Sequence, residues 1–387
     1  MQQKAFDYID NHKEDMIALW KDLVMQESFY EDKENIDKIA EKLKKEFEIM
    51  GGKAQIHHFD KAGGMLVGEY ALERVLPPIA FLGHMDTVCL PGTIEKRPFS
   101  IKDGVAYGPG VLDMKAGVVM ALYIMKALIN AGYKERGFKW LLAGDEENGH
   151  PYSSAVDLFE KNSQGCAAAF DMETGFVDNR IVVQRKGVAR YTLEIKGISA
   201  HVGNDPENGR SAILEMAHKI IAIQKLSNFE TGVTYNCGTI VGGTVPNAVP
   251  DYCKMVIDVR HPYVKDIMDI EKALKEITEN TIIAGTTSTL TKGATFKPME
   301  RTDGVMWLFD HIKQTSLELG LDMPTPITSG GGSDAAYSVV AGVPTLCSMG
   351  VKGGRNHSPE EFAVVDTMFE RCKLLIASIL KLRDYSI

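Results

Sequence analysis

The residues with the clearest capacity for chemistry are histidines and carboxylates that follow apolar runs of the chain. They are His84 and Asp86 after FLG, Asp113 in GPGVLD, Glu146 and Glu147 after LLAGD, Glu173 at the end of AFDME, and His357 in RNHSP. Any one of them alone would be more typical of a hydrogen-bonded structural residue or a solvated surface. Together they gather where separate strands are expected to end, and burying so many carboxylates without a cation would be very costly. The pattern therefore predicts a site for divalent ions.

The ligand types limit which ion the site would hold. Carboxylate and imidazole without thiolate fit Zn²⁺, Mn²⁺ or Co²⁺, and availability would decide among them. The six cysteines show no CxxC spacing and are predicted to be reduced, mostly buried thiols. Residues i and i+2 of an extended chain face the same way, so Asp86 is expected beside His84. A carboxylate such as Asp113 could bridge two ions about 3.5–4 Å apart.

Alternating strands and helices must position these side chains. Residues 4–50 predict amphipathic helices and residues 114–131 another helix, while buried strands are predicted at 79–82, 138–143 and 167–170. This alternation is typical of an α/β fold with a mixed, largely parallel sheet flanked by helices. Such sheets bind ligands just beyond the carboxyl ends of their strands, which is where the candidate residues fall.

The pattern changes near Gly187, and a chain of 387 residues is long enough for about two domains. A strand at 189–195 is followed by a helix at 211–226, strands at 233–241 and 253–259, and a helix at 265–280. This order is typical of one antiparallel sheet with helices on one face. We therefore expect an inserted α+β domain at 187–297. Residues 1–186 and 298–387 would form a discontinuous catalytic domain.

The composition argues against several classes of partner. The formal net charge of −9 disfavours binding to nucleic acid or to anionic membranes, both of which require a basic surface. The first residues lack the apolar core of a signal peptide, and no run approaches the ~20 apolar residues of a membrane span. We therefore expect a cytoplasmic protein.

Five ordered segments resemble the M20 metallopeptidases, the group of glutamate carboxypeptidase, peptidase T, aminoacylase-1 and succinyl-diaminopimelate desuccinylase. The segments are GHMDTV at 83–88, YGPGVLDMKAG at 107–117, GDEENG at 144–149, ISAHVG at 198–203 and GGGSDAA at 330–336. YGPG and GGGSDAAY are most similar to the glutamate carboxypeptidase branch. The resemblance covers nearly the whole chain. It implies a zinc-dependent exopeptidase-like catalytic domain with an inserted ferredoxin-like lid and dimerisation domain.

The resemblance also implies a role for each candidate residue in a two-metal centre. One ion would be bound by His84 and Glu173, the second by Glu147 and His357, and Asp113 would bridge them. Glu146 would be the general base and Asp86 would hold the His84 ring. Asp171 competes with Glu173 for one ligand position, and alignment with the family's Glu-Pro-Thr segment favours Glu173. Ala116 departs from the glycine that the family more often has there.

Further residues would contact the substrate. The resemblance implies that His201 reaches across a dimer interface to stabilise the oxyanion in the other subunit. Arg260 and Asn247 would bind a free carboxylate of the substrate, and glycines around Gly331 would let the backbone approach it closely. The alternatives are a surface histidine, a surface salt bridge of Arg260 and a simple glycine turn.

The predicted activity is two-metal hydrolysis of an amide or peptide bond next to a free carboxylate. The enzyme would be carboxypeptidase-like or an N-acyl-amino-acid amidohydrolase acting on small peptides or N-acyl amino acids, with zinc favoured and manganese or cobalt as alternatives. An amino-type di- or tripeptidase of the same family is the second hypothesis. A non-catalytic binding protein is disfavoured because Glu146 and every ligand position are present. A serine hydrolase is disfavoured because no GxSxG elbow occurs.

Overall fold

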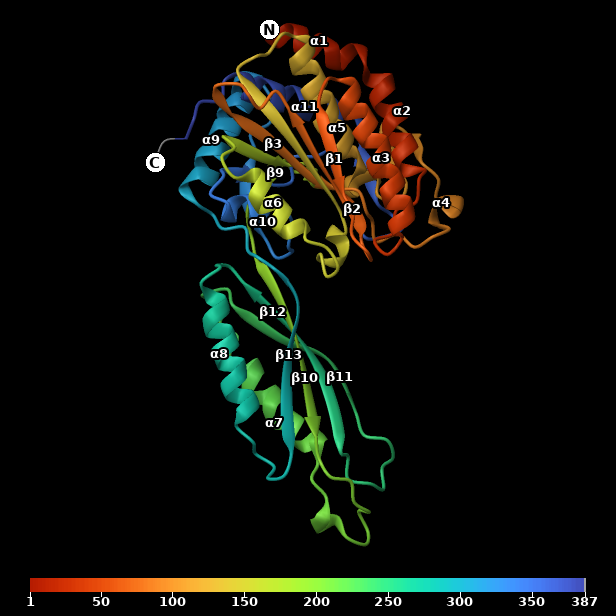
Figure 1. Cartoon of the computed structure of the whole chain (residues 1–387), viewed down its shortest axis with the longest axis vertical. Helices are drawn as coiled ribbons and strands as arrows, with labels where there is room; N and C mark the ends of the chain where they lie inside the picture. The colour runs from red at the N-terminus through yellow and green to blue at the C-terminus, as the bar shows by residue number, and fades with distance from the viewer. Residues whose placement is uncertain (386–387) are drawn as a thin grey trace. The chain divides into compact units, whose positions relative to one another are not determined.

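The structure, a computed structural model, describes residues 1–385 and contains two compact units (Figure 1). The first unit consists of Met1–Val183, Arg301–Thr328 and the chain from Ser333 on, and the second of Gln184–Glu300 and Ser329–Gly332. The insertion predicted at 187–297 falls inside the second unit, and its role as a lid and dimerisation domain stays a prediction. No helix among the described residues is long and apolar enough to cross a membrane.

The first unit is built on a six-stranded sheet of order β1-β2-β6-β3-β7-β15. The four strands β6, β3, β7 and β15 are mutually parallel, and β1 and β2 extend the sheet in antiparallel pairs. The strands are β1 (Lys53–His57), β2 (Gly63–Tyr70), β6 (Arg136–Gly144), β3 (Leu76–His84), β7 (Ala168–Asp171) and β15 (Thr345–Leu346). The predicted mixed, largely parallel sheet is confirmed, and the carboxyl ends of its parallel strands share one edge.

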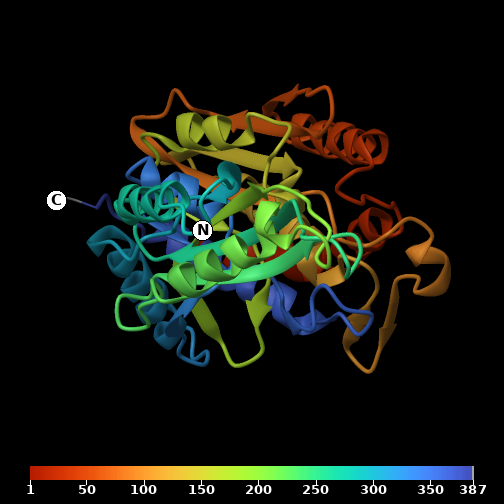
Figure 2. The ribbon, with the colours of Figure 1, turned by 90° about the horizontal axis from the view of Figure 1, so that it is seen from below.

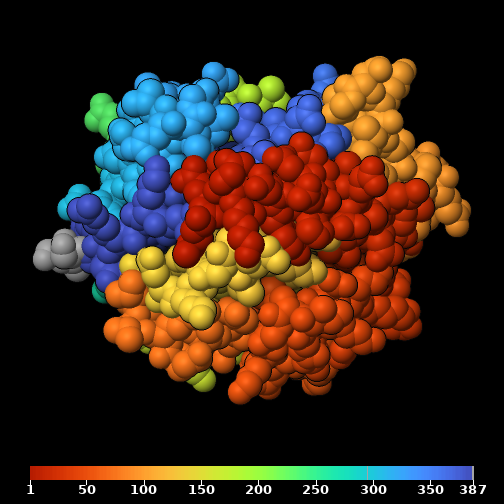
Figure 3. All heavy atoms as spheres, turned by 90° about the horizontal axis from the view of Figure 1, so that it is seen from above, coloured from red at the N-terminus to blue at the C-terminus, as the bar shows by residue number. Residues whose placement is uncertain are grey.

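Helices enclose this sheet because their apolar residues have no other surface on which to pack. Among them α5 (Ala116–Asn130) is buried on nearly every side, as expected for a helix that is apolar all round. It packs against α1 and α11, and Figure 3 shows the red N-terminal segment between yellow atoms, whose colour includes the end of α5, and blue C-terminal segments. The helices are α1 (Gln2–Asn11), α2 (Lys13–Val24), α3 (Lys33–Ile49), α4 (Thr93–Lys96), α6 (Ala155–Ser163), α9 (Asp303–Glu318), α10 (Ala335–Val340) and α11 (Val365–Leu380).

A smaller five-stranded sheet of order β4-β5-β17-β16-β8 brings distant parts of the chain to the same place. Its strands are β4 (Ser100–Lys102), β5 (Val105–Tyr107), β17 (Phe362–Val364), β16 (Lys352–Gly354) and β8 (Gly175–Phe176). The loop between β16 and β17 carries His357, and Asp113 follows β5. Pairing of β17 with β5 therefore sets these two residues near each other. Two further strands, β9 (Arg180–Arg185) and β14 (Thr325–Ser329), pair with each other.

The second unit has the order β-α-β-β-α-β in one antiparallel sheet, β11-β12-β10-β13. Both helices pack against the sheet, and its core contains residues of both helices and of β10 to β12 (Figures 1 and 2). The elements are β10 (Gly187–Lys196), α7 (Ala212–Gln224), β11 (Thr234–Gly242), β12 (Tyr252–His261), α8 (Asp266–Glu279) and β13 (Thr287–Phe296). The ferredoxin-like order confirms the predicted α+β fold. The sequence did not predict β13, because half of TSTLTKGATF is threonine or serine, although Leu290 packs against the core.

Candidate metal centre

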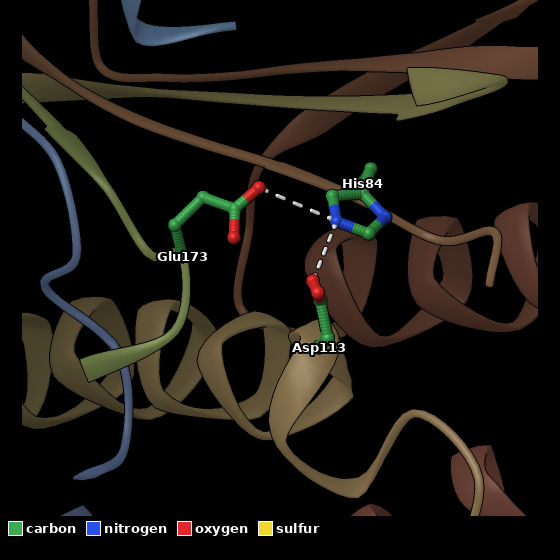
Figure 4. Close-up of side chains that lie close together, drawn as sticks. All are labelled: His84, Asp113 and Glu173. Atoms are coloured by element: carbon green, nitrogen blue, oxygen red, sulfur yellow. Dashed lines mark hydrogen bonds and ion pairs between the residues drawn. The ribbon is translucent and has the colours of Figure 1, made fainter. Parts of the chain in front are cut away.

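His84, Asp113 and Glu173 form the first group that could hold an ion (Figure 4). His84 ends β3, Glu173 lies two residues beyond the adjacent strand β7, and Asp113 lies in the short irregular π-helical segment η1 (Val111–Lys115) before α5. The Nε2 atom of His84 is 3.2 Å from Oδ1 of Asp113 and 3.4 Å from Oε1 of Glu173. All three side chains are buried, so one imidazole and two carboxylates converge in a low-dielectric site.

Asp113, Glu147 and His357 form a second group. The Nε2 atom of His357 is 3.2 Å from Oδ2 of Asp113 and 3.1 Å from Oε2 of Glu147. Asp113 thus presents one carboxylate oxygen to each group, which is the geometry of a carboxylate that bridges two ions. His357 has a backbone φ of +60°, a left-handed conformation that is uncommon outside glycine. The strain is consistent with a functional position.

Asp86 connects the first group to the turn that carries Glu146 and Glu147. Its backbone oxygen lies 3.1 Å from Nδ1 of His84, and its carboxylate Oδ1 lies 3.4 Å from the same atom. The carboxylate also accepts hydrogen bonds from the backbone N–H of Glu146 at 3.2 Å and of Glu147 at 2.9 Å. The predicted contact with the His84 ring is present, and the capping of η2 (Glu146–Asn148) is an additional contact that the sequence did not indicate.

Two residues of the C-terminal segment fix Asp113 and were missed from the sequence. The carboxylate of Glu361 accepts hydrogen bonds from the backbone N–H groups of Gly110, Leu112 and Asp113 at 3.1, 2.8 and 3.0 Å. Asn356 Nδ2 donates to Oδ2 of Asp113 at 2.9 Å. The one available signal was their closeness in sequence to His357, since Glu360-Glu361 otherwise resembles a solvated acidic pair.

Asp171 and Glu173, the two candidates for one ligand position, have different surroundings in the structure. Asp171 belongs to neither ion-binding group and its Oδ2 accepts a 2.5 Å hydrogen bond from Ser333 Oγ. Glu173 lies beyond the end of the strand, where its longer side chain reaches His84. The geometry therefore favours Glu173 for the contested ligand position.

The protein's own charges at this centre are those of a crowded acidic cluster. Although burial lowers the pKa of His84, hydrogen bonds to Asp113 and Asp86 outweigh it and raise that pKa well above the ordinary value. Hydrogen bonds to Asp113 and Glu147 raise the pKa of His357 to about 11. Burial raises the pKa of Glu147 to about 7. The neighbouring carboxylates therefore favour the protonated forms of both histidines.

The carboxylate of Glu146 is the candidate base beside this cluster. Burial raises its pKa well above the ordinary value, and the negative charges of Glu173, Asp334 and Glu147 add to that effect while His84 opposes it. A carboxyl group with a raised pKa next to metal ligands is typical of an acid–base residue. The charge of a bound cation would favour its ionised form.

The donor set fits two divalent cations. Each group contains one imidazole nitrogen and two carboxylate oxygens, and thiolates take no part. Oε1 of Glu147 is buried and has no hydrogen-bond partner within residues 1–385. A cation would compensate this group, whose burial without a partner is costly.

The six cysteines are free thiols, four of them buried, as the sequence predicted.

The predicted substrate-binding residues lie in the second unit, where Arg260 is already engaged. Its Nε and Nη2 atoms donate to the two carboxylate oxygens of Asp258 at 2.6 and 3.3 Å, and Nη1 donates to the Gly330 oxygen at 3.0 Å. Arg185 Nη1 donates to the oxygens of Gly331 and Gly332 at 3.4 and 3.0 Å. Arg260 therefore forms a salt bridge with Asp258, as in the alternative interpretation of this residue from the sequence.

His201 and Asn247 lie at the opposite end of the same sheet. Val202 donates its N–H to the Asn247 oxygen at 3.2 Å, and His201 bridges to Ala248. Arg260 pairs with Val188 at the start of β10, whereas Lys196 at its end pairs with Tyr252. Arg260 and Tyr252 are about 27 Å apart along β12 at about 3.4 Å per residue. One chain therefore does not bring Arg260 and Asn247 together around one carboxylate.

Comparison with known proteins gives one consistent family. The family described as peptidase family M20/M25/M40 matches residues 80–381. Carboxypeptidase G2 from Pseudomonas sp. (strain RS-16) is 26% identical over 305 residues, which cover 77% of this chain and 73% of that protein.

Two solved structures are similar over almost the whole chain. Aminopeptidase PepT from Bacillus cereus ATCC 10987 has a TM-score of 0.78 at 23% identity, with 95% of this chain and 98% of that chain covered. A tripeptidase from Staphylococcus aureus subsp. aureus Mu50 has a TM-score of 0.78 at 20% identity, with 95% and 97% covered. At these identities the two structures support the fold alone. With the family match spanning most of the sequence, the chain belongs to peptidase family M20/M25/M40 and is a metallopeptidase-type hydrolase.

Proposed function

We propose that this enzyme hydrolyses an amide or peptide bond next to a free carboxylate, with two divalent ions at the centre. The observation that carries the proposal is Asp113, whose two oxygens belong to separate ion-binding groups beside Glu146. Ions bound by these ligands would polarise the scissile carbonyl and lower the pKa of water. Zinc is the proposed metal because imidazole and carboxylate ligands suit it, with manganese and cobalt as alternatives.

In this mechanism Glu146 moves the protons. Its carboxylate accepts a proton from the attacking water and returns it to the leaving nitrogen. Asp86 keeps that carboxylate in place by accepting the backbone N–H groups of Glu146 and Glu147, and it orients the His84 ring. His84, Asp113, Glu147, Glu173 and His357 would serve as ligands.

A Glu146→Gln variant tests this assignment. It preserves the size of the side chain but removes the proton acceptor, so kcat should fall about 10²–10⁴-fold, while both ions remain bound. Glu135→Gln, at an exposed glutamate of the same unit, is the matched control and should retain full activity. A Glu146→Gln enzyme with near wild-type kcat would refute the mechanism.

The preference for a free carboxylate rests on Arg260. A guanidinium can hold a carboxylate through two nitrogens, and a substrate carboxylate would have to displace Asp258, the partner that Arg260 has in the structure. Arg260→Met should lower kcat/KM for an N-acyl amino acid about 10–100-fold, the equivalent of a charge-assisted hydrogen bond worth about 1.5–3 kcal/mol. The loss should be absent for the C-terminal amide of the same substrate. Arg190→Met is the matched control, because Arg190 also contacts Asp258.

The substrate class itself needs a direct assay. Metal-free enzyme restored with Zn²⁺, Mn²⁺ or Co²⁺ should be compared on N-acyl amino acids, dipeptides and tripeptides. The proposal expects turnover of N-acyl amino acids or of peptides with a free carboxyl terminus. Cleavage of tripeptides that requires a free amino terminus, with none of N-acyl substrates, would support the amino-type peptidase instead.

We further propose that the enzyme acts as a homodimer through the second unit. The separation of Arg260 from His201 and Asn247 within one chain supports this, because a second copy could supply the missing pair. Sedimentation should give a dimer. If inactive Glu146→Gln and His201→Ala chains are mixed, part of the activity should be restored, since each mixed dimer would contain one site with both Glu146 and His201 intact, whereas dimers of identical chains would stay inactive.

A further inference from the structure

His150 lies buried between two acidic residues that the mechanism above does not use. Its Nδ1 atom is 2.8 Å from Oδ1 of Asp145 and its Nε2 atom is 2.7 Å from Oδ1 of Asp334. The three side chains are 6%, 2% and 2% exposed, so the bridge is closed off from solvent. Burial alone would lower the pKa of His150, but Asp334 and Asp145 raise it well above the ordinary value. The two carboxylates therefore favour the protonated imidazole, whose charge opposes theirs.

This bridge closes the turn that presents Glu146 and Glu147. Asp145 and His150 flank that turn and are joined twice, by the ring contact and by the His150 N–H donating to the Asp145 oxygen at 3.2 Å. The φ of His150 is +57°, directly after Gly149 at +78°. A histidine in this left-handed region requires support from its surroundings, and the two carboxylates supply it.

The other end of the bridge reaches the strand that leads to Glu173. Asp334 follows Ser333, whose hydroxyl donates to Asp171 at the end of β7. The ring of His150 also packs edge-on against Tyr337, with centroids 6.1 Å apart. His150 thus joins the Glu146–Glu147 turn to a segment that is itself fixed to the carboxyl end of β7.

We propose that His150 is a positioning residue that holds the base Glu146 and the ligand Glu147 in register with the rest of the metal centre. It touches neither substrate nor ion, and it acts through Asp145 and Asp334. Without the imidazolium, two buried carboxylates would face each other unbalanced, and the 145–150 turn would lose its anchor. This inference rests on the proposed function of Glu146 and Glu147.

A His150→Gln variant of the metal-loaded full chain tests the inference. Glutamine can donate to one acid but cannot bridge both or carry the charge. Supporting residues around metal ligands typically contribute 10–100-fold to metal affinity or activity, and we expect a loss of about that size in kcat with KM within about twofold. The dissociation constant for Zn²⁺, measured by competition with a chromophoric chelator, should rise by about 10-fold or more.

The comparison must separate positioning from stability alone. All measurements are made well below the thermal midpoint of each variant, with folding checked by circular dichroism. His311→Gln is the matched control, since this half-buried histidine of α9 bonds the Ser378 oxygen, and it should match wild type in kcat and zinc affinity. If His150→Gln does not fold, Asp334→Ala removes the same bridge from its other end and should show the same losses.

The outcomes are distinct. A lowered thermal midpoint with kcat and zinc affinity within twofold of wild type would overturn the inference and leave the proposed function intact. Full activity of Glu146→Gln would instead overturn the proposed function, whatever His150→Gln shows.

Discussion

Loading the metal-free enzyme with two divalent ions should release at least two protons per chain at pH 7. In the metal-free state His357 lies within 3.2 Å of two carboxylates, which raise its pKa to about 11, and His84 is similarly placed. We therefore expect both imidazoles to be protonated at neutral pH before metal is added. An ion can bind only the neutral ring, so each histidine must give up one proton. Glu147, with a pKa of about 7, should add about half a proton.

The pH dependence of metal affinity follows with a definite sign. The pKa values of His84, His357 and Glu147 are all raised, so fewer of these ligands carry a proton that competes with the ion as the pH rises. Between about pH 7 and 9 the site of His357 should gain about tenfold in affinity per pH unit, one proton being displaced. Below about pH 7 the slope should steepen toward two protons, because Glu147 is then protonated as well.

Calorimetric titration of Zn²⁺ in buffers of different ionisation enthalpy measures the released protons directly. Under conditions where the remaining ligands still bind, His357→Ala should release about one proton fewer, whereas His311→Ala should match wild type. A metal affinity that does not change between pH 6 and 8, or release of fewer than two protons for two ions, would refute the reasoning.

Two further predictions concern buried carboxylates. Glu361→Gln should destabilise the protein by about 1–3 kcal/mol, since an amide N–H would face backbone donors, and it should weaken zinc binding. Thermal unfolding measures the stability, and competition with a chelator measures the zinc affinity. Glu360→Gln, at an exposed glutamate, is the control. In the second unit, burial opposes ionisation of Glu215, but N–H groups of Ile283 and Ile282 and the Lys219 amine lower its pKa below the ordinary 4.5. The ionised Glu215 therefore stabilises the fold above about pH 4.5, and this stabilisation is lost as the pH falls through its lowered pKa. The difference in free energy of unfolding between wild type and Glu215→Gln, measured with urea, should shrink from pH 6 to 3. A difference that stays constant would contradict this.

The sequence already indicated the fold class and the likeness of the centre to a two-metal site. Parallel strands bring their carboxyl ends to one edge, so residues such as His84 and Glu147, each following an apolar run, could be grouped without coordinates. The periodicity of the second unit likewise predicted an α+β fold. These features are local patterns, and burial of apolar surface makes their arrangement nearly obligatory.

Contacts between distant parts of the chain were decided only by the tertiary structure. The carboxylate of Glu361 accepts the N–H of Asp113 across 248 residues, and His150 meets Asp334 across 184. The choice of Glu173 over Asp171 depends on which side chain reaches His84. The sequence by itself thus determined which residues could bind and react. Only folding decided how they are held, because a buried polar group takes whichever partner the packing places within about 3 Å.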